Sequence, residues 1–161
     1  SPTCLWWSKL RCSNINKTMK TGKWRGQVLT KEMIDEDIVE FGLPMVAKCL
    51  EIILYFDPPN YWIENPATGK MKDVLDKLLP FVTLDYCKFG FDYRKRTRFW
   101  TNIPVKDNLC KRDCGKIIPF TRKHIATCDG GTAKKGQIGT TRHERYRVPS
   151  ELIEYLLDNL N

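Results

Sequence analysis

Apolar residues recur at helical spacing in several stretches of the chain. An acidic and apolar pattern over residues 31–41 predicts a short helix, and Gly42-Leu43-Pro44 is expected to break it. Beyond Pro44, the apolar positions run from Val46 to Phe56 at the spacing of one face of a helix. Two more helices are expected, one after Thr68-Gly69 and one from Pro149. Their apolar stripes are Met71, Val74, Leu75 and Leu78, and Leu152, Ile153, Leu156, Leu157 and Leu160.

Short apolar runs between these helices predict strands. Tyr61-Trp62-Ile63 is one, Phe81 to Tyr86 is a second, and Thr97 to Ile103 is a third that follows the turn at Gly90. The order helix, strand, helix, strand, strand indicates an α/β sheet with helices on its faces. Residues 1–29 are expected to form a long loop, and residues 104–145 are irregular and rich in Gly and Cys.

The charge of this 161-residue chain is unevenly distributed. The net charge is +8, but residues 88–147 alone carry 16 Lys and Arg against 5 Asp and Glu, while the rest of the chain balances at −3. Such segregation favours a polyanion as partner, most often nucleic acid. The alternative is a basic surface that is simply solvated. No apolar run approaches the length of about 20 residues that a membrane span needs, so no membrane partner is expected.

The cysteines indicate a reducing intracellular compartment, without distinguishing nucleus, cytoplasm or virion. Seven is an odd number in a medium-sized chain, whereas a disulfide framework usually has an even count in a small secreted domain. Four potential metal ligands lie close in sequence, and a Cys3His set of this kind can bind zinc. They are Cys110, Cys114, His124 and Cys128. The alternative is that these residues belong to the basic region without binding metal.

Two groups of charged residues at predicted strands are candidates for chemistry. Glu64 leaves an apolar strand just before Asn65-Pro66, where a carboxylate needs a partner or a function. The alternative is an ordinary strand-to-helix turn. Strand alternation places Arg96 and Arg98 on one face, and two adjacent guanidinium groups repel each other unless anions lie between them. The alternative is a charged edge strand.

Three motifs occur in an order that resembles the second half of DNA cytosine-5 methyltransferases, particularly their compact viral and phage branch. They are Ser1-Pro2-Thr3-Cys4, Ile63-Glu64-Asn65-Pro66, and the Arg96-Thr97-Arg98 element after Gly90. The resemblance covers nearly the whole chain and implies part of a Rossmann-like methyltransferase sheet with flanking helices. Residues 1–103 would be the second half of the catalytic domain, and 104–145 a small basic target-recognition region. Residues 146–161 would form a helix that returns to the catalytic domain.

The resemblance also implies roles for single residues. Cys4 would be the nucleophile that adds to C6 of cytosine, and Glu64 would share a proton with N3. Arg96 and Arg98 would stabilise the developing charge, on a base flipped out of the duplex. Asn65 would help to fix the nucleophile loop. The residues expected to contact DNA are Ser8, Asn65, Arg94, Lys95, Arg112, Arg122 and Lys123.

The methyl donor of this family is S-adenosylmethionine, and the family's donor site begins upstream of the Pro-Cys motif. We therefore expect an N-terminal segment or another chain to complete that site. Two further hypotheses stay open at this point. One is an inactive methyltransferase descendant that binds nucleic acid or serves as a structural component of a larger, viral assembly. The other is a small zinc-stabilised basic protein without methyltransferase ancestry.

Overall fold

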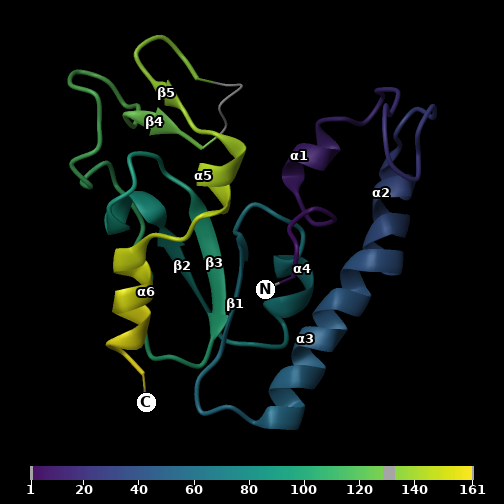
Figure 1. Cartoon of the computed structure of the whole chain (residues 1–161), viewed down its shortest axis with the longest axis horizontal. Helices are drawn as coiled ribbons and strands as arrows, with labels where there is room; N and C mark the ends of the chain where they lie inside the picture. The colour runs from purple at the N-terminus through teal and green to yellow at the C-terminus, as the bar shows by residue number, and fades with distance from the viewer. Residues whose placement is uncertain (1, 129–132, 161) are drawn as a thin grey trace.

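The protein forms a three-stranded sheet with helices on both faces (Figure 1). This computed structural model describes residues 2–128 and 133–160. Residues 1, 129–132 and 161 belong to segments named in the sequence predictions, and they lie outside the described residues. The central strand β3 (Arg96–Thr101) pairs antiparallel with β1 (Trp62–Pro66) and with β2 (Phe81–Asp85), so β1 and β2 run in the same direction. The expected mixture of helices and strands is confirmed, and the larger Rossmann-like sheet stays a prediction.

The helix before the sheet is longer than the sequence predicts. Three helical segments follow one another without a loop: α2 (Lys31–Asp37), η1 (Ile38–Gly42) and α3 (Leu43–Phe56). The predicted break at Gly42-Leu43-Pro44 is wrong, because the chain continues there through a π-helical turn in which the Leu43 amide donates to the Ile38 carbonyl. The wider turn accommodates Pro44, whose ring and missing N–H a regular α-helix does not tolerate.

One face of the sheet packs against α3, α4 (Lys72–Leu75) and the N-terminal segment. Helix α4 is the helix predicted after Thr68-Gly69, but it is only one turn long, with Asp76 as its C-cap. Met71 and Leu75 are buried, as its apolar stripe predicts. The N-terminal segment contains α1 (Lys9–Cys12) and is otherwise irregular, as predicted. The core on this face consists of Trp7, Val46, Ile63, Met71, Leu75 and Trp100.

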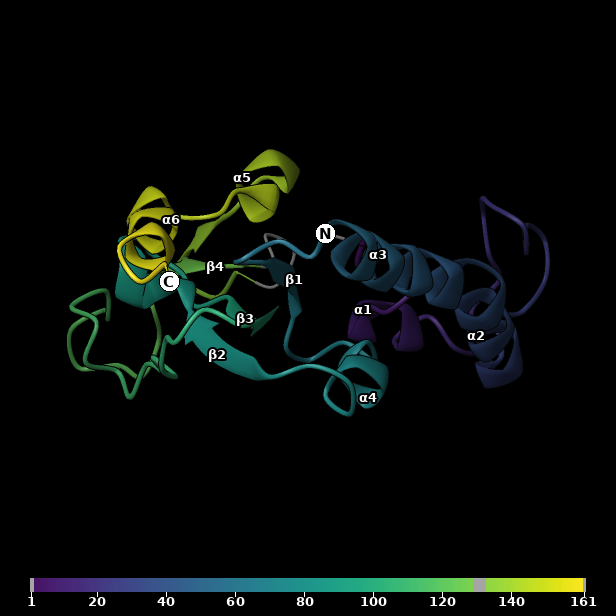
Figure 2. The same cartoon turned by 90° about the horizontal axis from the view of Figure 1, so that it is seen from below.

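The opposite face of the sheet packs against α6 (Ser150–Leu157) and the turn η2 (Tyr86–Phe89). Figure 2 shows α6 and α3 on opposite sides of the sheet. Leu152 and Leu156, which the periodicity places on the inner side of the last helix, are fully buried. They pack on Leu84, Tyr86, Phe89, Phe99, Ile103 and Val105.

The basic segment between β3 and α6 has little regular structure, as predicted. It contains β4 (Ala126–Thr127), β5 (Ile138–Gly139) and α5 (Arg142–Tyr146), and Thr141 with Glu144 forms a capping box at the start of α5. A hairpin over residues 116–125 is closed by backbone hydrogen bonds and turns at Phe120. In the described part of the chain, no helix has the length and apolar character needed to cross a bilayer.

We predict that Gly42→Ala destabilises the protein. A methyl group at residue 42 would lie 2.9 Å from Cζ2 of the buried Trp7 ring, closer than carbon atoms normally approach. Alanine usually stabilises a helix over glycine by about 0.5–1 kcal/mol, but the overpacking here is expected to reverse the sign and to cost about 1–3 kcal/mol. Urea unfolding measures the change. The control is Val39→Ala, an exposed position in the same π turn; a gain of stability from Gly42→Ala would contradict the packing.

Candidate active site

Two anchors hold the loop that carries Cys4 against the end of β1. The side-chain amide of Asn65 donates to the Pro2 carbonyl at 3.1 Å, and the Lys70 amide donates to the Trp7 carbonyl at 2.9 Å. Because two residues of chain span at most about 7 Å, Cys4 stays near the Asn65 end of β1. Asn65 is only 2% exposed, and its side-chain amide fixes this loop, as expected from the sequence.

The carboxylate of Glu64 lies on the face of the sheet that α5 and α6 cover. Glu64 is opposite Phe99 in the register, and its Oε1 accepts a hydrogen bond from the Tyr86 hydroxyl at 3.2 Å. The Lys95 ammonium lies 3.5 Å from the same oxygen and also donates to the Arg145 carbonyl. Burial, together with the Glu64 charge, raises the pKa of Tyr86 well above its usual value. Tyr86 therefore stays protonated, and its hydroxyl donates to the Glu64 carboxylate and orients it.

Arg96 and Arg98 share one face of β3, as strand alternation predicts, but it is not the face of Glu64. Arg98 is opposite Asn65 in the register, whereas Glu64 is opposite Phe99. The structure therefore places the arginines on the same sheet face as Asn65, which anchors the Cys4 loop, and does not bring them to Glu64. Arg98 pairs with Asp76 and lies 4.1 Å from the Phe81 ring. The anions that the two guanidinium groups require thus include carboxylates of the chain itself.

Asp85 connects Arg96 with the backbone of Cys110, in the loop that follows β3. Its carboxylate is fully buried and accepts from Arg96 Nε at 3.1 Å and Nη2 at 3.0 Å. The same carboxylate accepts from the Cys110 amide at 2.8 Å. The hydrogen bonds that Arg96 donates to Asp85 raise the pKa of Arg96, which stays charged. Three segments thus meet at one buried anion.

Four side chains that can bind a metal meet beside Asp85. Cys87, Cys110, Cys114 and His124 each offer a ligand atom, and these atoms all lie within 4.8 Å of one another. Cys128 of the sequence-predicted set is not among them, and Cys87 takes its place. Cys87 lies in η2, far from the other three in sequence, so their local spacing gave no signal for it.

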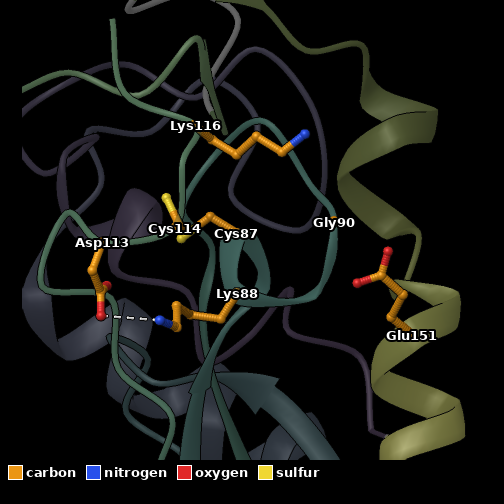
Figure 3. A pocket seen from close by; sticks show the side chains of 7 residues that line it. All are labelled: Cys87, Lys88, Gly90, Asp113, Cys114, Lys116 and Glu151. Atoms are coloured by element: carbon orange, nitrogen blue, oxygen red, sulfur yellow. Dashed lines mark hydrogen bonds and ion pairs between the residues drawn. The ribbon is translucent and has the colours of Figure 1, made fainter. Parts of the chain in front are cut away.

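The surroundings of the four side chains are polar and basic. Figure 3 shows Cys87 and Cys114 side by side in a pocket of about 430 Å³, next to the Lys88–Asp113 ion pair. All seven cysteines of the chain are free thiols. Burial raises the pKa of the Cys87 thiol, and burial lowers the pKa of His124, which favours the neutral imidazole.

A second pocket, of about 370 Å³, gathers four of the cations that the sequence assigned to nucleic-acid binding. Its basic side chains are Arg94, Arg112, Arg122 and Lys123. His124 and Cys128 also line this basic pocket, so it adjoins the four potential metal ligands. The other three predicted contacts do not line this pocket: the Ser8 carbonyl accepts from the Arg11 amide, Asn65 holds Pro2, and Lys95 pairs with Glu64. Phe120 stands fully exposed at the tip of the neighbouring hairpin, a position that the sequence did not reveal.

Fold and site together define an α/β protein with a thiol loop anchored at the end of β1, a carboxylate on the other face of that strand, and a separate basic pocket. The chain is 39% identical over 166 residues to a protein of Frog virus 3 (isolate Goorha) described as "Probable DNA (cytosine-5)-methyltransferase". The alignment spans 98% of this chain and 72% of the viral protein. The chain therefore belongs to the DNA (cytosine-5)-methyltransferase family, in a compact viral branch. No family model and no solved structure matches it.

Removal of the Asp85 carboxylate should be costly. Asp85→Ala leaves Arg96 and the Cys110 amide without their shared acceptor, and we expect a loss of about 2–4 kcal/mol in the free energy of unfolding. Glu51→Ala removes the partner of Lys48 in an exposed ion pair and should cost less than about 1 kcal/mol. Denaturant unfolding of both variants checks the difference, and equal losses would show that the buried site is not special.

Proposed function

We propose that this chain carries the base-attacking part of a DNA cytosine-5 methyltransferase. The observation that carries the proposal is the hydrogen bond from Asn65 to the Pro2 carbonyl, which holds the Cys4 loop at the strand that presents Glu64. Membership of the family and the name of the viral relative support the same reaction. Cys4 is half-buried in a loop, a setting in which a thiol can reach a substrate.

The proposed chemistry begins with addition of the Cys4 thiolate to C6 of a flipped cytosine. A sulfur–carbon bond forms, and the electron pair of the C5–C6 double bond moves through C4 to N3, which takes up a proton. Glu64, oriented by Tyr86 and Lys95, is the acid that shares this proton. The resulting enamine is nucleophilic at C5. C5 then forms a bond to an electrophile, which is a solvent proton or, where a donor is bound, its methyl group. Loss of the original C5 hydrogen as a proton, expulsion of the thiolate and return of the N3 proton to Glu64 then restore the aromatic ring.

The donor side of the reaction is not assigned to residues of this chain. The methyl donor of the family is S-adenosylmethionine, which needs an apolar wall for its adenine ring. The two pockets described above do not fit it, because charged and polar side chains dominate their linings. The outer edge of β1 has no strand partner within residues 2–128 and 133–160. We propose that another polypeptide segment or chain pairs there and supplies the donor site.

The basic pocket is the proposed contact to the DNA backbone. Four cations converge there from the β2–β3 connection and from the segment after β3, and such a set suits phosphate groups. Guanidinium groups bind phosphate in a bidentate manner, and three of the four cations are arginines. This contact would hold the duplex while the target base leaves the stack.

A second candidate function is DNA binding without catalysis. The arginines expected to assist the base are engaged by Asp85 and Asp76, and they lie on the sheet face opposite Glu64. A descendant that kept the fold and the basic pocket but lost the reaction would show this arrangement. The two functions differ in whether Cys4 attacks a base.

Exchange of the cytosine C5 hydrogen tests the attack without a methyl donor. Addition of the thiolate makes C5 basic, so solvent delivers a proton there and the original hydrogen leaves to water. We expect the full chain to release tritium from DNA that carries [5-³H]cytosine. Cys4→Ser should abolish the release because the hydroxyl is a far weaker nucleophile at neutral pH. Glu64→Gln should slow it by roughly 10²–10⁴-fold, the usual contribution of a general acid.

The matched control for this experiment is Cys12→Ser, which removes another half-buried thiol from the N-terminal segment. Its rate of release should equal that of the unchanged chain. Release that persists in Cys4→Ser would overturn the assignment of the nucleophile. Tight DNA binding without any tritium release from the unchanged chain would favour the non-catalytic function.

The basic pocket predicts a specific change in the salt dependence of DNA binding. Replacement of both Arg94 and Arg122 by Ala removes two proposed phosphate contacts. The slope of log K against log salt should then decrease in magnitude by about 1.8, since each contact contributes about 0.9. Fluorescence anisotropy with a labelled duplex measures it. Lys48→Ala, an exposed cation on α3, serves as the control, and an unchanged slope in the double variant would remove the pocket from the interface.

A further inference from the structure

We propose that Cys87, Cys110, Cys114 and His124 form a structural zinc site that holds the basic pocket to the end of the sheet. Their four ligand atoms lie within 4.8 Å of one another. They come from three separate parts of the fold: η2 after β2, the loop that follows β3, and the hairpin over residues 116–125. A metal would therefore cross-link these three segments.

The distances suit tetrahedral zinc. With Zn–S near 2.3 Å and Zn–N near 2.0–2.1 Å, ligand atoms of a tetrahedron lie about 3.6 Å apart for a sulfur–nitrogen pair and about 3.8 Å for two sulfurs. Cys110 Sγ and His124 Nε2 are 3.5 Å apart. The remaining separations, none above 4.8 Å, need only small movements of the side chains. Three thiolates and one imidazole also suit zinc better than the oxygen-preferring magnesium or calcium.

The backbone around Cys110 is already arranged for a thiolate ligand. The Arg112 amide donates to Cys110 Sγ at 3.2 Å, and such N–H groups aimed at sulfur stabilise its negative charge. Arg112 has a φ of 73°, so the chain accepts a left-handed residue to make this turn. The Cys110 amide is itself held by Asp85 at 2.8 Å. The first ligand is thus fixed from both sides.

Charge and burial at the cluster fit a bound cation. Cys87 and Cys110 are buried, and Cys114 and His124 are half-buried, so a metal there would be shielded from exchange with solvent. A zinc ion with three thiolates carries one net negative charge. Lys88 and Lys116, which line the adjoining pocket, lie where they can balance it.

The proposed zinc site adjoins the basic pocket. His124 is one of its ligands, Arg112 donates to Cys110 Sγ, and both residues also line that pocket. The consequence for DNA binding rests on that proposed function, whereas the metal site itself does not. Zinc would fix the hairpin that carries Arg122 and Lys123 relative to the sheet. Its removal should loosen the pocket and weaken the binding of DNA.

The test measures zinc in the full chain by mass spectrometry, after expression with zinc and purification without chelators. We expect about one zinc per chain, as for a closed four-ligand site. Cys87→Ser should reduce the content to near zero. Cys128→Ser is the matched control and should keep the zinc, because Cys128 is not among the four ligands. Cys87→His, which offers a nitrogen ligand in place of sulfur, should retain part of the metal.

Titration of the metal-free chain with Co²⁺ provides a second readout that does not depend on the folding of a variant. Tetrahedral cobalt–thiolate absorption should appear and should vanish when zinc is added. Three results would overturn the site: a folded unchanged chain without zinc, zinc lost from Cys128→Ser but kept in Cys87→Ser, or a disulfide among the three cysteines under reducing conditions. Zinc without DNA binding would refute only the proposed function, and DNA binding by a metal-free folded chain would refute only the zinc site.

Discussion

The buried carboxylate of Asp85 fixes how the sheet and the basic segment are joined. It accepts two hydrogen bonds from Arg96 at the start of β3 and one from the Cys110 amide. A desolvated carboxylate is stable only when a cation balances its charge and donors satisfy its lone pairs. The end of β2, the start of β3 and the loop at Cys110 must therefore come together at the same time. Cys87 follows Asp85 closely along the chain, and the four Cys and His side chains assemble around this joint. The basic pocket depends on the joint in turn, since it shares His124 with that cluster.

The two faces of the sheet separate the parts of the proposed reaction. The Cys4 loop lies on the face of Asn65 and Arg98, where Trp7 is buried in the core. Glu64 turns to the other face, toward Tyr86 and Lys95. A flipped cytosine would therefore sit across the end of β1, with its C6 toward one face and its N3 toward the other. Asn65 is important in this arrangement because it fixes the loop at the point where the faces meet.

The sequence predicted those elements whose burial pattern is local. The strands at Phe81 and Thr97 and the last helix are found because their apolar residues alternate or repeat with respect to one packed face. The break expected at Gly42-Leu43-Pro44 is absent, since the same residues also fit a π-helical turn packed on Trp7. Gly and Pro in the sequence do not show whether a helix stops or continues through a π-helical turn, because tertiary contacts such as the one with Trp7 decide between the two.

The candidate site shows the same division between local and tertiary information. Alternation placed Arg96 and Arg98 on one face correctly, but their partners Asp85 and Asp76 come from other segments. The motif order, by contrast, led to the family that the viral relative supports.

The four potential metal ligands also depend on tertiary structure. Local spacing suggested Cys128 as the fourth ligand, whereas the fold brings Cys87 to Cys110, Cys114 and His124.

In the two proposals, the separation of Cys4 from the four potential metal ligands gives the cysteines two different roles. A thiolate bound to zinc is stabilised and shielded, which suits a cross-link and makes it a poor nucleophile toward a base. Cys4 stands apart from the four ligands, in a loop fixed by Asn65 and Trp7. In the proposed function, the short basic segment is the part of the described chain that contacts DNA. The proposed zinc site would lie under that segment, and the proposed nucleophile would stay on the sheet. The segment that contacts DNA would then be rigid while the Cys4 thiol stays accessible.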